Sequence, residues 1–181
     1  MNTNGIPLRI LFVCTANICR SPTAEVLARH HFGEERAMFR SAGFLSAGQS
    51  PPATLIQVLG ERGLDASQHH SYKLDDASLE AADLVLTMEG EHVQKATLLH
   101  SQSFPKIIPL KEAAQVAQQM MARSFTVDQL VDAVASQRDA TSYLGTTWNV
   151  DDPYNRKRRD YERAVTEIDS LVLTTIGPLV S

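Results

Sequence analysis

Cys14 and Arg20 are the two residues of this chain whose types and spacing most directly suggest a chemical reaction. Five residues separate them, between the apolar run 10–13 and the dipeptide Ser21-Pro22, which is typical of a helix start. A loop between a strand and a helix directs several backbone N–H groups, and the positive end of the helix dipole, toward one point. Such a loop favours an anion. It promotes loss of the thiol proton and lets a guanidinium contact two phosphate oxygens together.

A purely structural interpretation has to be weighed against this one. A free cysteine is commonly a small buried core side chain, and a nearby arginine is commonly a surface charge. The spacing alone is a weak signal. Because the strand, the helix start and Asn17 all accompany it, the sequence predicts a phosphate-binding loop rather than a core cysteine.

The elements that would hold this loop alternate along the chain. Short apolar runs predict strands, and apolar residues at helical spacing, with Gly or Pro at the ends, predict helices. Strands are predicted at residues 8–13, 37–42, 83–88 and 106–108, and helices at 21–33, 51–63, 91–99, two within 111–137, and 160–173. Thr126 and Gln129 form a capping-box pattern at the second of the paired helices. This alternation implies an α/β fold with a parallel sheet covered by helices on both faces.

The composition is that of an ordinary globular domain. The chain has 181 residues, 43% of them hydrophobic and 21% charged, and we expect a single domain over 1–181. A formal charge of −4 argues against general nucleic-acid binding. The sequence shows no secretory leader pattern and no apolar run of about 18 residues, and its two cysteines cannot form a disulfide framework. We therefore expect a cytoplasmic protein with no membrane partner.

A general acid is the second requirement for cleaving a phosphate ester through a cysteine, because the departing oxygen needs a proton. Asp152 is the candidate. The residue before a proline adopts an extended backbone, so Asp152-Pro153 would hold a carboxylate on a rigid loop. An Asp-Asp-Pro sequence is also common in turns, and without the Cys14 loop we would interpret it as a turn with no catalytic role. Asp151 is the alternative acid, since an error of one residue in register exchanges the two.

Together these stretches resemble the low-molecular-weight protein tyrosine phosphatase family. The resemblance rests on three motifs, which are VCTANICRSP from Val13, SAG from Ser41 and DPY from Asp152. It covers about residues 8–110 and 148–178. It implies a three-layer sandwich with a four-stranded parallel sheet and the phosphate loop after the first strand. It also implies a cysteinyl-phosphate intermediate and no metal or other cofactor.

By the same resemblance, each motif residue takes a role. Cys14 would be the nucleophile, Arg20 the clamp on the equatorial phosphate oxygens, and Asp152 first the acid and then the base. Ser21 would donate its hydroxyl to the Cys14 thiolate, and Asn17 would fix the loop through hydrogen bonds to its backbone. The phosphate would bind the loop residues Thr15, Ala16, Asn17, Ile18, Cys19, Arg20 and Ser21.

Cys19 matches the second loop cysteine of the family. That cysteine can form a reversible disulfide with the nucleophile and protect it from over-oxidation. The alternative for Cys19 is a small buried side chain with no redox role. Both interpretations remain open from the sequence.

Three features depart from the family pattern. The aromatic residue that members often carry soon after the Ser-x-Gly motif is a Trp or Tyr, and here only Phe44, Tyr154 or Trp148 would line a slot for a phosphotyrosine ring. The stretch 69–73 (HHSYK) lacks the arginine of a His-x-x-Arg pattern, and residues 111–147 look like a helical insertion. Phosphate-ester cleavage is therefore better supported than a preference for phosphotyrosine.

The sequence thus predicts a phosphatase that hydrolyses phosphate monoesters, foremost the phosphotyrosine of a phosphorylated protein. Arsenate reduction is a rival, because the same loop accepts arsenate; with no cysteine after Cys19, it would need a small external thiol. A catalytically silent phosphoprotein-binding module is another rival, but binding alone would require neither thiol nor acid. The six histidines show no metal-ligand spacing. The basic run 156–159 is either solvated or draws in an anionic substrate.

Overall fold

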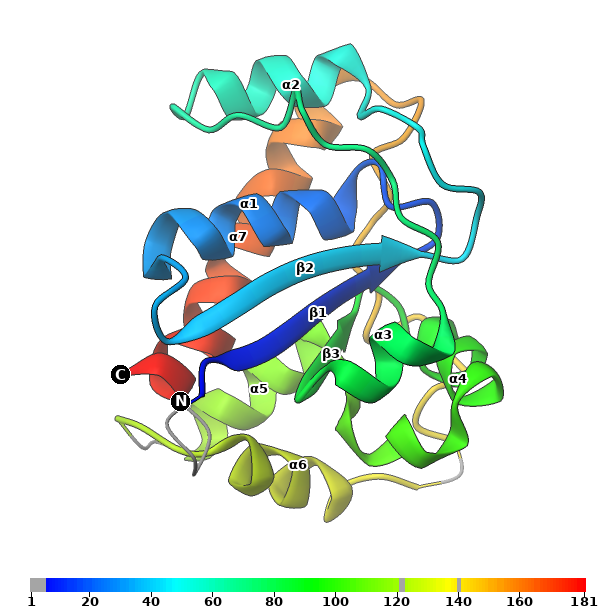
Figure 1. The fold of residues 1–181 in the computed structure, drawn as a ribbon, viewed down its shortest axis with the longest axis vertical. Helices are drawn as coiled ribbons and strands as arrows, with labels where there is room; N and C mark the ends of the chain where they lie inside the picture. The colour runs from blue at the N-terminus through cyan, green and yellow to red at the C-terminus, as the bar shows by residue number, and fades with distance from the viewer. Residues whose placement is uncertain (1–5, 121–122, 140) are drawn as a thin grey trace.

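A four-stranded parallel sheet forms the centre of the molecule in the computed structural model, which describes residues 6–120, 123–139 and 141–181 (Figure 1). The strands are β1 Leu8–Cys14, β2 Ala37–Gly43, β3 Leu84–Thr87 and β4 Ile107–Pro109. Their order across the sheet is β2-β1-β3-β4, and every pairing is parallel. The predicted α/β class is confirmed, and each predicted strand is present with its ends shifted by at most one residue.

Helices cover both faces of the sheet and give the molecule three layers. The helices are α1 Arg20–Phe32, α2 Ala53–Gly60, α3 Asp76–Ala81, α4 Gly90–Leu99, α5 Leu110–Met120, α6 Val127–Ala135 and α7 Arg158–Val180. Alternate residues of a strand point to opposite faces, so β1 contributes to two cores. Ile10 and Phe12 join the core beneath α1, α5 and α7, whereas Leu11 and Val13 join the core beneath α3 and α4 (Figure 1).

Local sequence signals set several helix ends as predicted. Helix α1 ends at Gly33, where φ is 65° and the N–H donates to the carbonyl of Arg29. That backbone conformation is one that glycine adopts without steric cost. At the start of α6, Thr126 and Gln129 form both hydrogen bonds of the predicted capping box.

The structure adds elements that the pattern analysis did not predict. Helix α3 is six residues long, and its only clear signal is the cap, where Asp75 accepts a hydrogen bond from the Ser78 N–H. The 3-10 segment η1 (Ser101–Lys106) is also additional. Helix α7 continues to residue 180, past the predicted end at 173, because Ile176 and Leu179 remain buried in the core.

Helix α5 belongs to the main core although it lies within the segment predicted to be inserted. It packs against α7 and buries Ala113, Val116 and Ala117, while α6 packs against α5. That residues 111–147 form an insertion into one domain remains a prediction.

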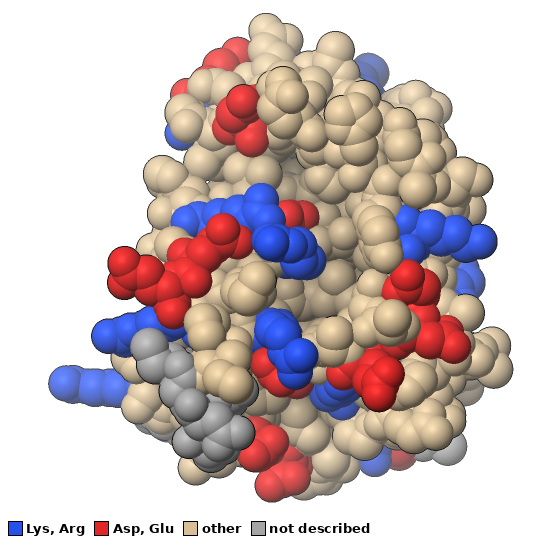
Figure 2. All heavy atoms as spheres, viewed as in Figure 1, with Lys and Arg blue, Asp and Glu red and all other residues tan. Residues whose placement is uncertain are grey.

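The surface mixes charges of both signs. On the face drawn in Figure 2, basic and acidic side chains lie in neighbouring groups rather than in one broad field. Within the described ranges, no helix combines the length and the hydropathy that crossing a membrane requires.

Candidate active site

The loop between β1 and α1 encloses a pocket at the Cys14 thiol. Because β1 ends at Cys14 and α1 begins at Arg20, residues 15–19 turn around the N-terminus of the helix. The pocket has a volume of about 220 Å³. Its lining consists of Cys14, Thr15, Ala16, Ile18, Cys19, Arg20, Leu45, Gln49, Asp152 and Tyr154. Of the predicted loop residues, Asn17 and Ser21 do not line it; both are fully buried.

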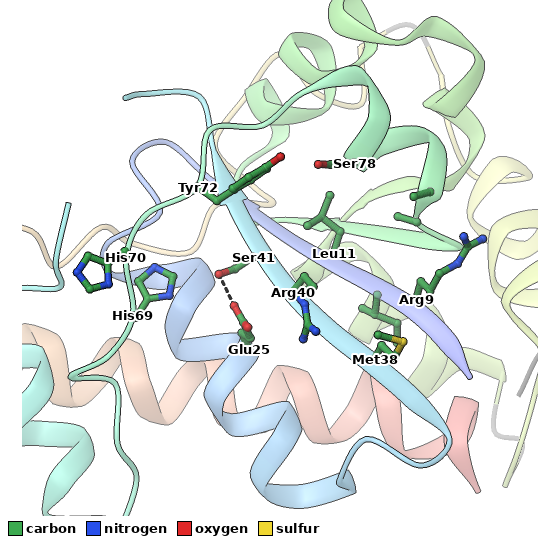
Figure 3. Close-up of a pocket in the computed structure, with 13 residues that line it drawn as sticks. Arg9, Leu11, Glu25, Met38, Arg40, Ser41, His69, His70, Tyr72 and Ser78 are labelled. Atoms are coloured by element: carbon green, nitrogen blue, oxygen red, sulfur yellow. Dashed lines mark hydrogen bonds between the residues drawn. The ribbon is translucent and has the colours of Figure 1, made fainter. Parts of the chain in front are cut away.

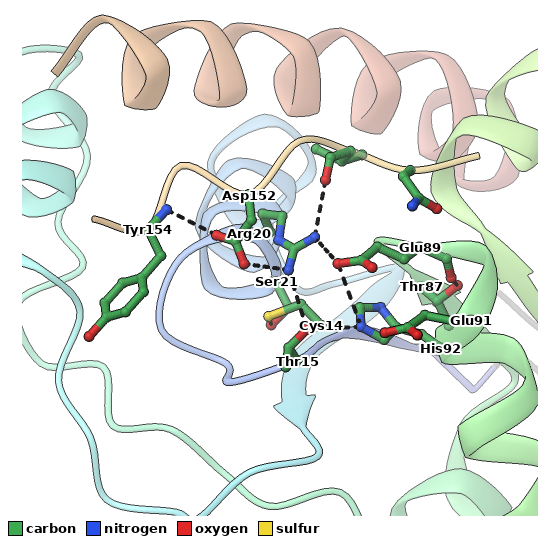
Figure 4. A network of polar contacts seen from close by, with 12 residues as sticks. Cys14, Thr15, Arg20, Ser21, Thr87, Glu89, Glu91, His92, Asp152 and Tyr154 are labelled. Carbon is green, nitrogen blue, oxygen red and sulfur yellow. Dashed lines mark hydrogen bonds and ion pairs between the residues drawn. The ribbon is translucent and has the colours of Figure 1, made fainter. Parts of the chain in front are cut away.

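Two polar groups face the sulfur of Cys14. The backbone N–H of Asn17 donates to Sγ across 3.2 Å. Ser21 Oγ lies 3.0 Å from Sγ (Figure 4). Cys14 is only 2% exposed and lines the pocket wall. Donors directed at sulfur stabilise its anionic form, so this arrangement suits a thiolate. Ser21 thus lies where the sequence analysis placed it.

Asn17 fastens the loop to neighbouring segments. Its side-chain NH₂ donates to Ser21 Oγ (2.9 Å) and to Ser41 Oγ (2.8 Å), and its Oδ1 accepts from the backbone N–H of Tyr72 (2.8 Å). These partners differ from the loop backbone that the resemblance implied. The φ of Asn17 is 54°, a left-handed conformation that asparagine tolerates better than most residues. His69 completes the set, with Nε2 2.8 Å from the Asn17 carbonyl.

Gly43 explains the third residue of the Ser-Ala-Gly motif. A Cβ added there would lie 2.7 Å from the backbone nitrogen of Asn17, closer than atoms pack in proteins. Just after it, the N–H groups of Phe44 and Leu45 donate to the Thr15 carbonyl. The end of β2 therefore supports the phosphate loop by direct backbone contact, which any larger residue at position 43 would prevent.

Arg20 is almost completely buried, with 2% exposure, and polar groups surround its guanidinium. Nη1 donates to Glu89 and to the Val150 carbonyl (3.1 Å), and Nη2 donates to Asp152 Oδ2 (2.6 Å) (Figure 4). Burial lowers the pKa of Arg20, but the charges of Cys14, Asp152 and Glu89 outweigh this effect and raise it. The guanidinium is therefore a permanent cation beside the sulfur.

Glu89 is a site residue that the sequence analysis missed. It lies two residues past the end of β3 at Thr87 and forms an ion pair with Arg20. No motif contains it, but strand order offers a signal. Since β3 lies beside β1, a residue just past the carboxyl end of β3 falls next to the loop after β1.

The structure separates the two candidate acids. Asp152 lines the pocket, ion-pairs with Arg20 and accepts a hydrogen bond from the Tyr154 N–H (3.0 Å). The side chain of Asp151 is 75% exposed and lies 3.6 Å from Arg163, outside the residues that line the pocket. Of the two adjacent aspartates, the one in the pocket is therefore Asp152, which the sequence analysis preferred.

Cys19 also lines the pocket and is 3% exposed. Burial, with smaller contributions from the negative charges of Asp152 and Cys14, raises the pKa of Cys19 to about 12. Its thiol is thus protonated at neutral pH. Both cysteines are free thiols in this structure.

The outer part of the pocket is formed by Leu45, Gln49 and Tyr154. Of the three aromatic residues considered from the sequence, only Tyr154 lines the pocket. Phe44 packs on His92 instead, with ring centroids 5.4 Å apart, and the Trp148 indole donates to the Ser142 carbonyl. Leu45 and Tyr154 are each about half exposed, so they form an apolar rim above the sulfur.

One group of metal-ligating side chains lies near the site within the described residues. Ligand atoms of Glu89, Glu91 and His92 are all within 4.8 Å of one another. Glu89 is paired with Arg20 and Glu91 with Lys95. A metal ion there would have to compete with both ion pairs and would lie beside a guanidinium.

A larger cavity of about 530 Å³ lies along β2 beside α3 (Figure 3). Glu25, Ser41, His69 and Tyr72 contribute to its wall, and Ser41 donates a hydrogen bond to Glu25. Because Ser41 also accepts from Asn17, this wall is connected to the phosphate loop from behind. Its lining contains neither Cys14 nor Arg20, so the chemistry of the smaller pocket is absent there.

The fold and site define a class of α/β proteins in which a loop with a cysteine and an arginine connects the first strand to the first helix. A family model described as low molecular weight phosphotyrosine protein phosphatase matches residues 9–124. The match extends through α5 and so past the start of the predicted insertion. The chain belongs to the low molecular weight phosphotyrosine protein phosphatase family, a family of enzymes.

Individual relatives carry several activities in their names. The probable low molecular weight protein-tyrosine-phosphatase EpsP of Ralstonia nicotianae is 32% identical over 106 residues, which are 59% of this chain and 72% of that protein. An arsenate reductase of Bacillus licheniformis is 38% identical over 89 residues, 49% of this chain and 62% of that protein. The solved YwlE arginine phosphatase from Geobacillus stearothermophilus aligns with a TM-score of 0.71 and 25% identity, covering 93% of this chain and 90% of that one.

Proposed function

We propose that this chain hydrolyses phosphate monoesters, foremost protein phosphotyrosine, through a phosphocysteine at Cys14. The observation that carries the proposal is that one pocket joins Cys14 and Arg20, from a single loop, with Asp152, which lies 132 residues after Arg20 in the sequence. A phosphoryl group in the loop would meet a sulfur nucleophile, a fork of cationic donors and an acid. A silent binding module would need neither the thiol nor the acid. The free thiols suit a reducing compartment such as the cytoplasm.

In the first step the Cys14 thiolate attacks phosphorus and the S–P bond forms as the P–O bond breaks. Arg20 donates to two equatorial oxygens, and the substrate displaces Asp152 from its ion pair with the guanidinium. Released from the guanidinium, the Asp152 carboxylate takes up a proton from solvent and then gives it to the departing oxygen. Ser21 donates its hydroxyl to the sulfur and so stabilises the thiolate before attack.

In the second step water attacks the phosphocysteine. The Asp152 carboxylate takes a proton from that water, the S–P bond breaks, and phosphate leaves as the thiolate is restored. The backbone N–H groups of the loop and Arg20 stabilise the charge on the phosphoryl oxygens in both steps.

The preference for an aromatic ester rests on the apolar parts of the pocket. Ile18, Leu45 and Tyr154 line it and provide flat, apolar contact for a phenyl ring. A guanidinium leaving group would call for a further carboxylate, and the one carboxylate among the residues that line the pocket, Asp152, already serves as the acid in the proposed steps. Phosphotyrosine therefore fits the lining better than phosphoarginine.

Arsenate reduction is the second candidate because an arsenate reductase is among the relatives. The loop suits any tetrahedral oxyanion, but the chain has only two cysteines, Cys14 and Cys19. A thiol supplied from solution would have to complete the electron transfer.

One substrate panel tests the proposed function against its rivals. The purified protein is given phosphotyrosyl peptides, phosphoarginyl peptides, alkyl phosphates, and arsenate with a small thiol. We expect kcat/KM to be highest for phosphotyrosyl peptides. Higher kcat/KM for phosphoarginine, or arsenate-dependent oxidation of the thiol without ester hydrolysis, would assign the other activity, and binding without turnover would show a silent module.

The Asp152→Ala variant should lose general acid help. For an alkyl or weakly acidic phenyl leaving group we expect turnover to fall about 10²–10⁴-fold, with a smaller loss for nitrophenyl phosphate, whose oxyanion leaves readily. The rate is measured over a series of leaving groups. The matched control is Asp151→Ala, which should stay near the parent rate; if that variant shows the loss instead, the acid has been misassigned.

Cys19→Ser tests the redox role. Peroxide oxidises the Cys14 thiolate to a sulfenic acid, and the Cys19 thiol would condense with it to give a disulfide and water, which an added thiol reduces. We expect the parent to regain activity after peroxide and dithiothreitol, and Cys19→Ser to regain much less. Equal recovery would leave Cys19 as a buried packing residue.

A further inference from the structure

His92 is a buried polar residue beside the phosphate loop with no part in the steps above. It lies in the first turn of α4, is fully buried and stacks on Phe44. Its Nε2 is 3.0 Å from Thr15 Oγ1, and Thr15 lines the pocket next to Cys14 (Figure 4). The imidazole thus contacts a residue of the pocket wall without itself being among the lining residues.

The imidazole of His92 is neutral at the pH of any ordinary assay. Burial, followed by the positive charges of Arg20 and Lys95, lowers the pKa of His92 to about 3. A neutral imidazole carries one N–H. Nδ1 is buried and has no hydrogen-bond partner in the part of the chain that the structure describes. Because a buried N–H without an acceptor is less tolerable than a bare lone pair, the proton belongs on Nε2.

This tautomer determines the direction of the Thr15 hydroxyl. With its proton on Nε2, His92 donates to Thr15 Oγ1, and Arg20 Nη2 also donates to that oxygen at the longer distance of 3.4 Å. The two donors occupy both lone pairs of the oxygen. The hydroxyl proton must then point away from both of them, and the pocket that Thr15 lines is where an acceptor would be.

We propose that the Thr15 hydroxyl is a further hydrogen-bond donor to the bound phosphoryl group, and that His92 is the positioning residue that fixes it in the donating orientation. This inference rests on the proposed function only in that a phosphoryl or similar oxyanion occupies the pocket. It adds a side-chain donor to the backbone N–H groups of the loop. It also fits a histidine that is neutral at assay pH, because a protonated ring would need an acceptor at Nδ1.

The test measures binding of inorganic phosphate, which requires no turnover. A hydrogen bond to a charged group is worth about 10- to 100-fold in affinity. Thr15→Val should therefore raise the dissociation constant for phosphate by about that factor. Thr15→Ser keeps the hydroxyl and is the matched control; it should bind phosphate within about 3-fold of the parent. Calorimetry or competitive inhibition gives these constants, and thermal unfolding shows whether each variant is folded.

The His92 variants separate positioning from packing. His92→Gln places an amide N–H near the position of Nε2 and should retain most of the affinity for phosphate. His92→Leu should lower the affinity for phosphate, by a smaller factor than Thr15→Val does. In the double variant Thr15→Val/His92→Leu, the second change should add nothing to phosphate affinity, because both remove the same donor. Equal phosphate affinity in Thr15→Val and the parent, additive losses, or no phosphate binding by the parent would each overturn the inference.

The outcomes also distinguish this inference from the proposed function. If the parent binds phosphate in a Thr15-dependent way but hydrolyses no phosphate ester, the proposed function fails and the Thr15 donor stands. If the parent hydrolyses phosphotyrosine and Thr15→Val binds phosphate normally, only the inference about Thr15 and His92 fails.

Discussion

Cys14→Ser should abolish hydrolysis of aryl phosphates. The serine hydroxyl occupies the position of the sulfur but is not ionised at neutral pH, and the chain holds no imidazole in the pocket lining that would activate it. We expect kcat to fall on the order of 10⁵–10⁶-fold, the loss typical of removing a nucleophile. Steady-state turnover of nitrophenyl phosphate measures this loss, and rapid-quench trapping of a phosphorylated parent enzyme should show the label on Cys14.

The Cys19→Ser variant is the matched control, since it makes the same atomic change in the same loop. Before any oxidation it should keep most of the parent's turnover, because Cys19 neither donates to Cys14 nor ionises at neutral pH. Phosphate binding to Cys14→Ser shows that the loop is still formed. If Cys14→Ser retains more than trace turnover, the nucleophile assignment is wrong.

Arg20→Lys should cause the second largest loss. A lysine keeps the positive charge but has no planar fork, so it cannot contact two phosphoryl oxygens and Glu89 together. An arginine that stabilises a transferring phosphoryl group is worth about 10³–10⁵-fold in kcat, and we expect a loss in that range. The substitution also removes the Arg20 Nη1 group that forms the ion pair with Glu89. Single-turnover kinetics with saturating substrate separates this loss in kcat from weaker binding.

Arg163→Lys is the control for Arg20→Lys. Arg163 lies near the same acid loop, contacts Asp151 and is 60% exposed at its side chain. Its substitution should change kcat by less than about 2-fold, because exposed ion pairs contribute little. If Arg20→Lys retains a comparable rate, the bidentate contact is not what stabilises the phosphoryl group.

Residues that are close in sequence were predictable. The strand before Cys14, the helix from Arg20 and the spacing between them lie in one short stretch, so local propensity and the helix dipole fix their arrangement. The capping box at Thr126 and the stop at Gly33 were predictable for the same reason. The parallel sheet followed from the alternation of strands and helices, because a crossover returns the chain in the same direction.

Other contacts between residues from distant elements were not predictable from the sequence. Glu89 and His92 belong to no motif, and they reach Arg20 and Thr15 only because β3 pairs with β1 and α4 starts at the same edge of the sheet. The roles expected of Phe44 and Trp148 in a substrate slot fail for a similar reason. The Phe44 ring packs on His92, and the Trp148 indole donates a hydrogen bond to the Ser142 carbonyl.

The sequence by itself determined that a thiol and a guanidinium share one loop between a strand and a helix, since seven consecutive residues leave the backbone few ways to arrange them. Only the tertiary structure decided three further features. These are which of the two adjacent aspartates lines the pocket, which carboxylate after β3 forms an ion pair with Arg20, and which side chains form the rim of the pocket. Those choices depend on strand order and on the competition among side chains for buried space, and neither leaves a local pattern in the chain.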